Sequence, residues 1–258
     1  MKKNIIALLI LLTLTTGVVF AQGSKESTTE GPKTYIMAAN CEWPPLEFID
    51  ENGKITGFEM ELLVELSTVT GYNFQPKNVA WDGIFAGLAN GAYDGVASGV
   101  SVTEERKKAL VFSDPILTVK QSIIVLEDNE VPPTSVNELK EKKVGVQIGT
   151  TGDILLQDSG VDITIMSYDS IALAIEDLIN GNLDAVVLDS VVAGEYVITN
   201  KVFANKLKVS GTSDENLEPI AMCFKKENTE LVAIVNKGLK QLQESGKMDE
   251  LKAKWAIL

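Results

Sequence analysis

The chain has 258 residues, with 36 acidic against 23 basic side chains and a formal net charge of −13. Nucleic acid and anionic membranes would repel so negative a protein, so neither is expected as a partner. The absence of histidine excludes histidine-based catalytic triads, histidine general bases and histidine metal sites, and we expect no metal or cofactor. The length fits two domains of about 100 to 130 residues each.

Residues 1–21 have the pattern of a secretory signal sequence. Lys2 and Lys3 precede an apolar run over residues 5–20, and Ala21 is a small residue suited to the position before cleavage. A membrane anchor is the competing interpretation, but the run is short and interrupted by threonines and a glycine. We expect export with cleavage near Ala21. No cysteine follows the run directly, so a lipid-anchored form is not expected.

The next part of the chain begins with a polar segment at residues 22–33, which is expected to be a flexible tether. An apolar strand is predicted over residues 34–39, followed by a loop that Pro44 and Pro45 stiffen. A helix is predicted over residues 58–70, because apolar residues recur on one of its faces and a glycine follows it.

From residue 73 onward, short apolar segments alternate with helical ones. Such alternation predicts α/β domains with mainly parallel sheets flanked by helices. The expected strands are residues 73–79, 95–97, 143–148, 163–166, 183–188, 206–210 and 219–225, with two more between 111 and 125. The expected helices are residues 82–89, a helix beginning near 103, a short helix at 135–139, a helix beginning at 153, a helix ending at 179, and residues 190–199 and 230–246.

The segment over residues 94–115 has the features of an anion site. Its strand ends in the small residues Ser98 and Gly99, and Thr103 is suited to cap the helix that follows. Arg106 falls in the first turn of that helix, where the helix dipole disfavours a cation. A guanidinium there, close to free backbone N–H groups, suits a small carboxylate. A solvated arginine on a surface helix is the alternative.

The sequence around this segment is echoed later in the chain. Trp81-Asp82 leads to Asp94 in the first copy, and Tyr168-Asp169 leads to Asp184 in the second. The echo predicts two lobes of similar construction. Ligands of open α/β sheets bind beyond the carboxyl ends of strands.

In the aligned copies, Ser98-Gly99 and Leu188-Asp189 occupy equivalent strand ends. Two facing lobes would therefore bring Asp189 opposite Ser98, Ser101 and Arg106. The alternative role for Asp189 is to cap the helix that follows it, and one residue can do both.

These residues together suit an L-amino acid, which carries one carboxylate and one ammonium. Arg106, helix N–H groups and hydroxyls such as Thr151 would hold the carboxylate, and Asp189 would hold the ammonium. Trp43 and Trp81, both near strand ends, would enclose the side chain. Packing in the core is the alternative for each tryptophan.

The sequence resembles bacterial extracellular solute-binding proteins of family 3, the periplasmic polar amino-acid receptors of ABC importers. The resemblance covers about residues 34 to 256. It rests on the segments WPPLEF (43–48), GFEMEL (57–62), WDG (81–83), SVTEERK (101–107), FSDP (112–115) and VGVQIGTTG (144–152).

The resemblance implies a two-lobed type II periplasmic-binding-protein fold that closes on its ligand. Lobe 1 would comprise residues 34–119 and 220–258, and lobe 2 residues 120–219. Hinge strands are expected near residues 117–121 and 218–222. The protein would be a monomeric receptor, not an enzyme, that delivers its ligand to the membrane permease of an ABC importer.

The resemblance also implies roles for individual residues. Arg106 would clamp the ligand carboxylate with support from Ser101 and Thr151, and Asp189 would hold the ammonium with the Gly99 carbonyl and Ser101. Trp43 and Trp81 would flank the side chain. The residues expected to determine side-chain specificity are Asn40, Glu42 and Gln147. Asn40 stands where some receptors for basic amino acids carry an acid, which weakens the case for lysine or arginine.

Two alternative functions and one chemical question remain open in the sequence. A receptor that passes ligand status to a membrane sensor is one alternative. A dehydratase of cyclohexadienyl acids is the other, disfavoured by the lack of histidine and of paired catalytic carboxylates. Cys41 and Cys223 could form a disulfide, although two free buried thiols are the favoured interpretation.

Overall fold

The computed structural model describes residues 31–203, 205–213 and 217–257. The predicted signal sequence and most of the predicted tether lie outside the described residues. From Pro32 onward the chain forms one compact unit. Within the described residues, no helix is both long enough and apolar enough to cross a membrane.

The first sheet has the strand order β5-β1-β6-β15-β7. Strands β5, β1 and β6 are parallel, whereas β15 runs antiparallel to both β6 and β7. Its strands are β1 (Thr34–Ala39), β5 (Asn73–Asn78), β6 (Gly95–Val96), β7 (Leu110–Phe112) and β15 (Cys223–Lys225).

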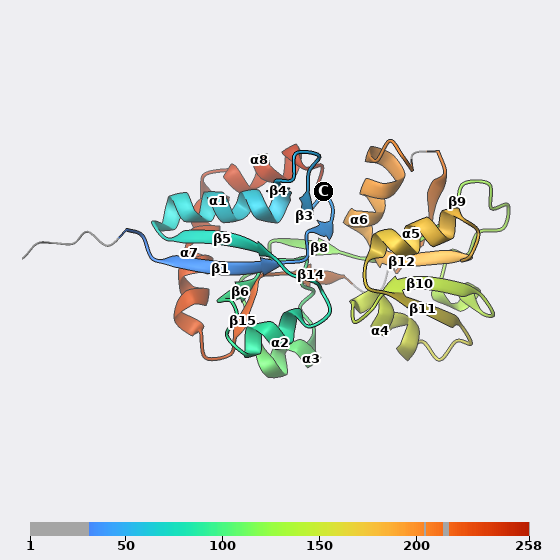
Figure 1. Ribbon diagram of the computed structural model, residues 1–258, viewed down its shortest axis with the longest axis horizontal. Helices are drawn as coiled ribbons and strands as arrows, with labels where there is room; N and C mark the ends of the chain where they lie inside the picture. The colour runs from blue at the N-terminus through green and yellow to red at the C-terminus, as the bar shows by residue number, and fades with distance from the viewer. Residues whose placement is uncertain (1–30, 204, 214–216, 258) are drawn as a thin grey trace, which may run out of the picture. The chain divides into compact units, whose positions relative to one another are not determined.

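Helices cover both faces of the first sheet. Figure 1 shows α1 and α8 on one face and α2 and α3 on the other. Alternate residues of β1 point to opposite faces, so Met37 packs with the core under α1 and Ala38 with the core under α2. The helices are α1 (Phe58–Thr70), α2 (Ile84–Ala89), α3 (Glu104–Ala109), α7 (Thr229–Glu244) and α8 (Lys247–Lys254).

The predicted helix over residues 58–70 is confirmed as α1, with its first and last residues as expected. Phe58, Leu62 and Leu66 on its apolar face are fully buried. Gly71 ends it in the left-handed conformation, and its N–H donates to the Ser67 carbonyl.

The second sheet has the order β11-β10-β12-β9-β13. Its strands β11, β10 and β12 are parallel, and β9 runs antiparallel to both β12 and β13. The strands are β9 (Gln121–Leu126), β10 (Lys143–Gln147), β11 (Thr164–Tyr168), β12 (Ala185–Asp189) and β13 (Leu207–Thr212).

Helices also flank the second sheet, with α5 and α4 packed on opposite faces. The longer of these, α5 (Ile171–Ile179), buries Ile175 and Leu178 against the sheet. The other helical segments are α4 (Thr151–Asp158), a 3-10 helix at Val136–Leu139, α6 (Ser190–Gly194) and a π-helical turn at Glu195–Thr199.

The two sheets repeat one plan, as the echo in the sequence predicts. In each sheet, the first three strands in the order are parallel. The fourth strand pairs antiparallel with the third and with the fifth. The prediction of mainly parallel sheets therefore holds for three strands of each sheet, while the sheets as wholes are mixed. Strands β9 and β15 follow directly on segments that cross between the sheets. They need no helical crossover, so they can enter antiparallel to their neighbours.

The crossing segments are β8 (Leu117–Val119) and β14 (Glu218–Ile220), which pair antiparallel with each other. The single strand predicted over residues 219–225 is thus two strands, because the chain passes from the two-stranded sheet of β8 and β14 into the first sheet. A further small antiparallel sheet joins β2 (Glu42–Trp43), β3 (Glu47–Ile49) and β4 (Ile55–Thr56).

Candidate functional site

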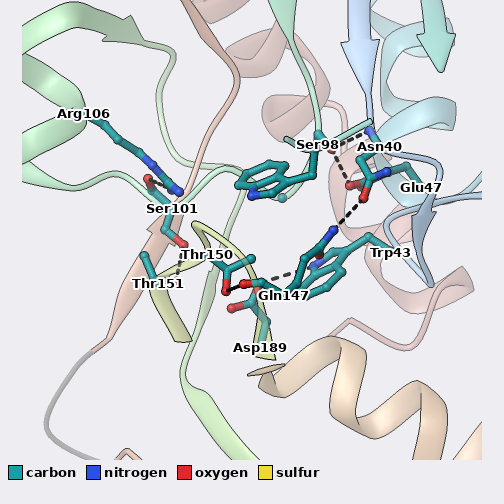
Figure 2. A pocket seen from close by; sticks show the side chains of 12 residues that line it. Asn40, Trp43, Glu47, Ser98, Ser101, Arg106, Gln147, Thr150, Thr151 and Asp189 are labelled. Carbon is teal, nitrogen blue, oxygen red and sulfur yellow. Dashed lines mark hydrogen bonds between the residues drawn. The ribbon is translucent and has the colours of Figure 1, made fainter. Parts of the chain in front are cut away.

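One cavity brings most of the predicted site residues together. Figure 2 shows Arg106 and Ser101 on one side of it and Asn40, Ser98 and Glu47 on the other. Its lining comes from segments that follow strands of both sheets. The lining residues are Asn40, Trp43, Glu47, Trp81, Ser98, Gly99, Ser101, Arg106, Gln147, Thr150, Thr151 and Asp189.

Arg106 is the cation of the cavity. It lies on α3, which Thr103 caps as predicted by accepting a hydrogen bond from the Arg106 backbone N–H at 3.1 Å. The guanidinium donates to the carbonyls of Ser101 (2.9 Å) and Gly149 (3.3 Å). Among the described residues no acidic side chain forms an ion pair with it, so its charge is available to an anion in the cavity.

Aromatic rings hold the Arg106 guanidinium in place. Its central carbon lies 5.6 Å from the ring centre of Trp81 and 5.1 Å from that of Phe85, within the range of cation–π contacts. Burial lowers the pKa of Arg106, but an arginine side chain stays protonated in proteins. The predicted alternative of a solvated surface arginine is therefore wrong.

Hydroxyl groups lie beside this cation. Ser101 Oγ and Thr151 Oγ1 are 3.3 Å apart. Thr151 is the first residue of α4, which begins there instead of at Asp153 because Thr150 caps it by accepting from the Asp153 N–H. The start of an eight-residue helix thus faces the same cavity as Arg106, which adds N–H groups suited to an anion.

Asp189 is the anion of the cavity and is only 6% exposed. It occupies the cap position of α6, but its side chain forms no capping hydrogen bond, contrary to the alternative role considered from sequence. Instead, Oδ1 accepts from Gln121 Nε2 at 2.7 Å and Oδ2 accepts from Trp43 Nε1 at 3.3 Å. Burial raises the pKa of Asp189 to about 7, against the effect of these hydrogen bonds.

Trp43 and Trp81 are buried and also line the cavity. Each packs against a different hydrophobic core, so the core-packing alternative and the predicted site role both describe part of their environment. Trp81 stacks edge-to-face on Phe85, which fixes its ring.

The turn after β6 supplies backbone as well as hydroxyl groups. Gly99 has φ +56°, and a Cβ atom there would lie 3.2 Å from Trp43 Cδ1, so the turn requires glycine at this position. The Gly99 N–H donates to Glu59 Oε1 at 2.7 Å. Ser98 Oγ donates to Glu47 Oε1 and accepts from the Asn40 N–H, and it is therefore committed to holding the turn.

The far side of the cavity contains two of the three predicted specificity residues. Gln147 Nε2 donates to Asn40 Oδ1 (3.2 Å) and to the Asp169 carbonyl (2.9 Å). The third, Glu42, is exposed and does not line the cavity. Glu42 and Trp43 are neighbours on β2, and successive side chains of a strand point to opposite faces.

Glu47, and not the predicted Glu42, is the glutamate that lines the cavity. It is fully buried, and its Oε2 has no hydrogen-bond partner among the described residues. Burial, reinforced by the charge of Glu59, raises the pKa of Glu47 well above its ordinary value. Its pairing with Trp43 across β2 and β3 places both side chains on one face, and this hairpin register is the signal from which it could have been found.

Other groups near the cavity are missed by sequence reasoning. Thr150 lines it. Gln121 contacts two site residues from behind it. Within the described residues, no group of three His, Cys, Asp or Glu side chains is arranged to hold a metal ion. Both cysteines are buried as free thiols.

Two helix-flanked α/β sheets, with a cavity of opposite charges lined from both, define a protein that binds a small polar molecule. The sequence pattern described as bacterial extracellular solute-binding proteins, family 3, matches residues 35–257. The chain belongs to this family.

Known relatives agree with this assignment. A probable histidine-binding protein of Neisseria gonorrhoeae is 32% identical over 260 residues, covering 99% of this chain and 96% of that protein. An ancestral arginine-binding protein bound to arginine superposes with a TM-score of 0.81 at 33% identity, covering 87% and 99% of the two chains.

A second similar structure is the ancestral amino acid-binding protein AncCDT-1, a precursor of cyclohexadienyl dehydratase. It has a TM-score of 0.79 and 34% identity, with 86% and 95% of the two chains covered. The fold of this chain is the two-lobed type II periplasmic-binding-protein fold, as predicted.

Proposed function

We propose that the protein is an exported receptor that captures a basic L-amino acid and delivers it to the permease of an ABC importer. The observation that carries the proposal is the presence of Arg106 and Asp189 on one cavity, neither of them ion-paired with an oppositely charged side chain of the described residues. Two fixed charges of opposite sign suit a zwitterion. The names of relatives that bind histidine or arginine support this ligand class.

The α-carboxylate would bind at Arg106, helped by the hydroxyls of Ser101 and Thr151. A guanidinium can donate two parallel hydrogen bonds to a carboxylate, which fixes its orientation. The α-ammonium would bind Asp189 and the Gly99 carbonyl. Because Trp43 lies against Asp189, the rest of the ligand would extend between the tryptophan rings.

The charge of the ligand side chain is inferred from Glu47. Its buried Oε2 has no partner among the described residues, and the other two charged residues of the cavity lining, Arg106 and Asp189, are assigned to the ligand carboxylate and ammonium. A cationic head group would pair with the ionised carboxylate and compensate its burial. Asn40 therefore does not argue against a basic ligand, because the acid is supplied from the next strand.

Capture would involve closure of two lobes, residues 34–119 with 220–258 and residues 120–219. The pairing of the crossing strands β8 and β14 supports a hinge there. Ligand that contacts residues of both lobes favours the closed arrangement, since those contacts exist together only there. The receptor would act as a monomer in the periplasm after cleavage near Ala21.

We further propose that the protein has no catalytic activity, although AncCDT-1 is a precursor of a dehydratase. Asp189 and Glu47 already accept hydrogen bonds from Trp43, Gln121 and Ser98, which suits binding more than proton transfer. Incubation with a cyclohexadienyl acid should give no product. Turnover abolished by an Asp189 or Glu47 substitution would contradict the proposal.

Calorimetry on protein freed of bound ligand by unfolding and refolding tests the proposed function. At neutral pH, L-arginine and L-lysine should bind at least about tenfold more tightly than L-glutamine, because their side chains bring a cation to Glu47. Tighter binding of neutral amino acids would contradict the basic ligand class. Failure of every amino acid to bind would contradict the receptor function itself.

A further inference from the structure

Gln121 joins three parts of the site without lining the cavity. It is the first residue of β9, directly after the crossing strand β8, and is only 2% exposed. Its Nε2 lies 2.7 Å from Asp189 Oδ1, 3.1 Å from Thr151 Oγ1 and 3.2 Å from Glu218 Oε1. The three acceptors belong to β12, α4 and the crossing strand β14.

The surroundings fix which way the amide points. Two of its three neighbours are carboxylates, and an ionised carboxylate only accepts hydrogen bonds, so the nitrogen must face them. The amide oxygen points the other way and has no partner among the described residues. A Cβ at position 152 would lie 2.8 Å from that oxygen, and Gly152 therefore leaves room for this orientation.

The backbone of Gln121 is held as firmly as its side chain. Its N–H donates to Ser213 Oγ at 3.0 Å, and its carbonyl accepts from the Ser213 N–H at 2.8 Å. Asp189 is its direct register partner on β12. The amide is therefore a fixed donor placed between the carboxylates of Asp189 and Glu218.

We propose that Gln121 is a positioning residue, which orients Asp189 for the ligand ammonium and ties it to the crossing strand through Glu218. The inference rests on the proposed function in one respect, that Asp189 receives the ligand ammonium. Asp189 has two oxygens, and Gln121 occupies one of them. Oδ2, the oxygen that Gln121 does not contact, accepts one hydrogen bond from Trp43 and keeps a second lone pair for the ammonium.

The charges around Asp189 explain why a neutral donor is needed there. The Glu218 carboxylate disfavours ionisation of Asp189, whereas Arg106, the Trp43 N–H and the Gln121 amide favour it. Burial acts against the charge as well. Without the amide, the carboxylates of Asp189 and Glu218 would lose the hydrogen-bond donor that lies between them.

The first test needs no ligand. Melting temperatures at pH 5 and pH 8 would be measured for the wild type, Gln121→Ala, Asp189→Asn and the double variant. Gln121→Ala should lose more melting temperature at pH 8, where the carboxylates are charged, and Asp189→Asn should at least halve this difference between the pH values. An equal loss at both pH values, or a difference unchanged by Asp189→Asn, would overturn the proposal.

The second test measures binding of L-arginine and of 5-guanidinopentanoate, which is arginine without its α-amino group. Gln121→Ala, and more so Gln121→Glu, should weaken arginine binding at least about tenfold, the effect of losing a hydrogen bond to a charged group. Binding of the analogue should change less than about threefold, since it has no ammonium for Asp189. Gln75→Glu, at an exposed position of β5, is the control for added charge.

The outcomes separate this proposal from the proposed function. Equal losses for both compounds would show a general structural role and overturn the assignment of Gln121 to Asp189. A wild type that binds no amino acid would contradict the proposed function, and the melting experiment would still decide whether Gln121 positions Asp189.

Discussion

The indole N–H of Trp43 lies 3.3 Å from the Asp189 carboxylate, joining residues 146 positions apart in the chain. Trp43 belongs to the small sheet beside the first large sheet, and Asp189 ends a strand of the second. A hydrogen bond of this kind stabilises the ionised form of the carboxylate. It also places an aromatic wall directly against the proposed ammonium site.

Asp189→Asn should abolish most amino-acid binding. Removing one member of a buried charge pair costs about 2–5 kcal/mol, because the other member is left uncompensated. Isothermal titration calorimetry against L-arginine measures the loss. Asp158→Asn, at the exposed end of α4, removes the same charge away from the cavity and should leave affinity unchanged. Equal affinity of Asp189→Asn and the wild type would contradict the ammonium assignment.

Arg106→Lys should bind nearly as poorly as Arg106→Ala. Lysine keeps the charge but cannot form two parallel hydrogen bonds or stack on Trp81 and Phe85 as a planar group. We expect a loss of about 2–5 kcal/mol for alanine and only partial recovery for lysine in calorimetry. Lys108→Ala, on the exposed side of the same helix, is the matched control. Full recovery by lysine would show that only charge matters at this position.

Glu47→Gln should change specificity more than stability. The amide keeps an acceptor for Ser98 but loses the charge proposed to bind a cationic head group. Arginine affinity should fall by about 1.5–3 kcal/mol, the contribution of a hydrogen bond between charged groups, while glutamine affinity should change little. Competition of the two amino acids against a fluorescent ligand would measure the ratio. Parallel losses for both amino acids would argue against a basic ligand.

Gly99→Ala should lower both stability and affinity. The left-handed backbone costs a residue with a Cβ about 1–2 kcal/mol, and here the Cβ would also press on Trp43. Gly160→Ala provides the matched control, because Gly160 has φ +68° with no atom near its would-be Cβ. Both variants should lose melting temperature, but only Gly99→Ala should lose ligand affinity. Affinity losses of the same size would point to a general effect.

Stability without ligand should fall as pH rises from about 4 to about 7. Burial raises the pKa of Glu59 and of Asp189 to about 7, so the folded protein holds protons that the unfolded chain releases at lower pH. Their stabilising contribution is complete below the unfolded pKa near 4 and is lost as pH rises through about 7.

Replacing Glu59 tests this pH dependence. Glu59→Gln removes the titrating group and keeps an acceptor for the Gly99 N–H, so melting temperature should depend less steeply on pH. Glu51→Gln, in the exposed hairpin turn, should leave the slope as it is. A steeper slope in Glu59→Gln than in the wild type would reverse the sign of the expected linkage.

Local patterns in the sequence predict much of the fold. The helix at residues 58–70, the Thr103 cap and the echo that gives both sheets one strand order depend on neighbours close in the chain. The antiparallel entry of β9 and β15 depends on pairing between distant segments. Apolar residues alternate in the same way in a parallel and in an antiparallel strand, so the sequence pattern does not reveal the direction of β9 and β15.

The site divides in the same way. Arg106 and Asp189 carry local signals, a cation in a first helical turn and an acid at a strand end. Glu47 contacts Ser98 across 51 positions, and Gln121 contacts Asp189 and Glu218 across 68 and 97 positions, so chain folding alone gives these side chains their partners. The Glu42 side chain is exposed, whereas the Glu47 side chain faces the interior. A strand of two residues is too short for its sequence to show which side chain faces inward.

The reactivity of the two cysteines depends on whether the first sheet is folded. Cys223 is the first residue of β15 in the first sheet, and Cys41 lies two residues after β1 of the same sheet. Both are buried, and burial raises the pKa of each thiol to about 12. The reactive thiolate is thus nearly absent while this part is folded. The sequence contains no other cysteine. The rate of labelling by a thiol reagent, with and without amino acid, would therefore measure how often the first sheet opens, separately from the second.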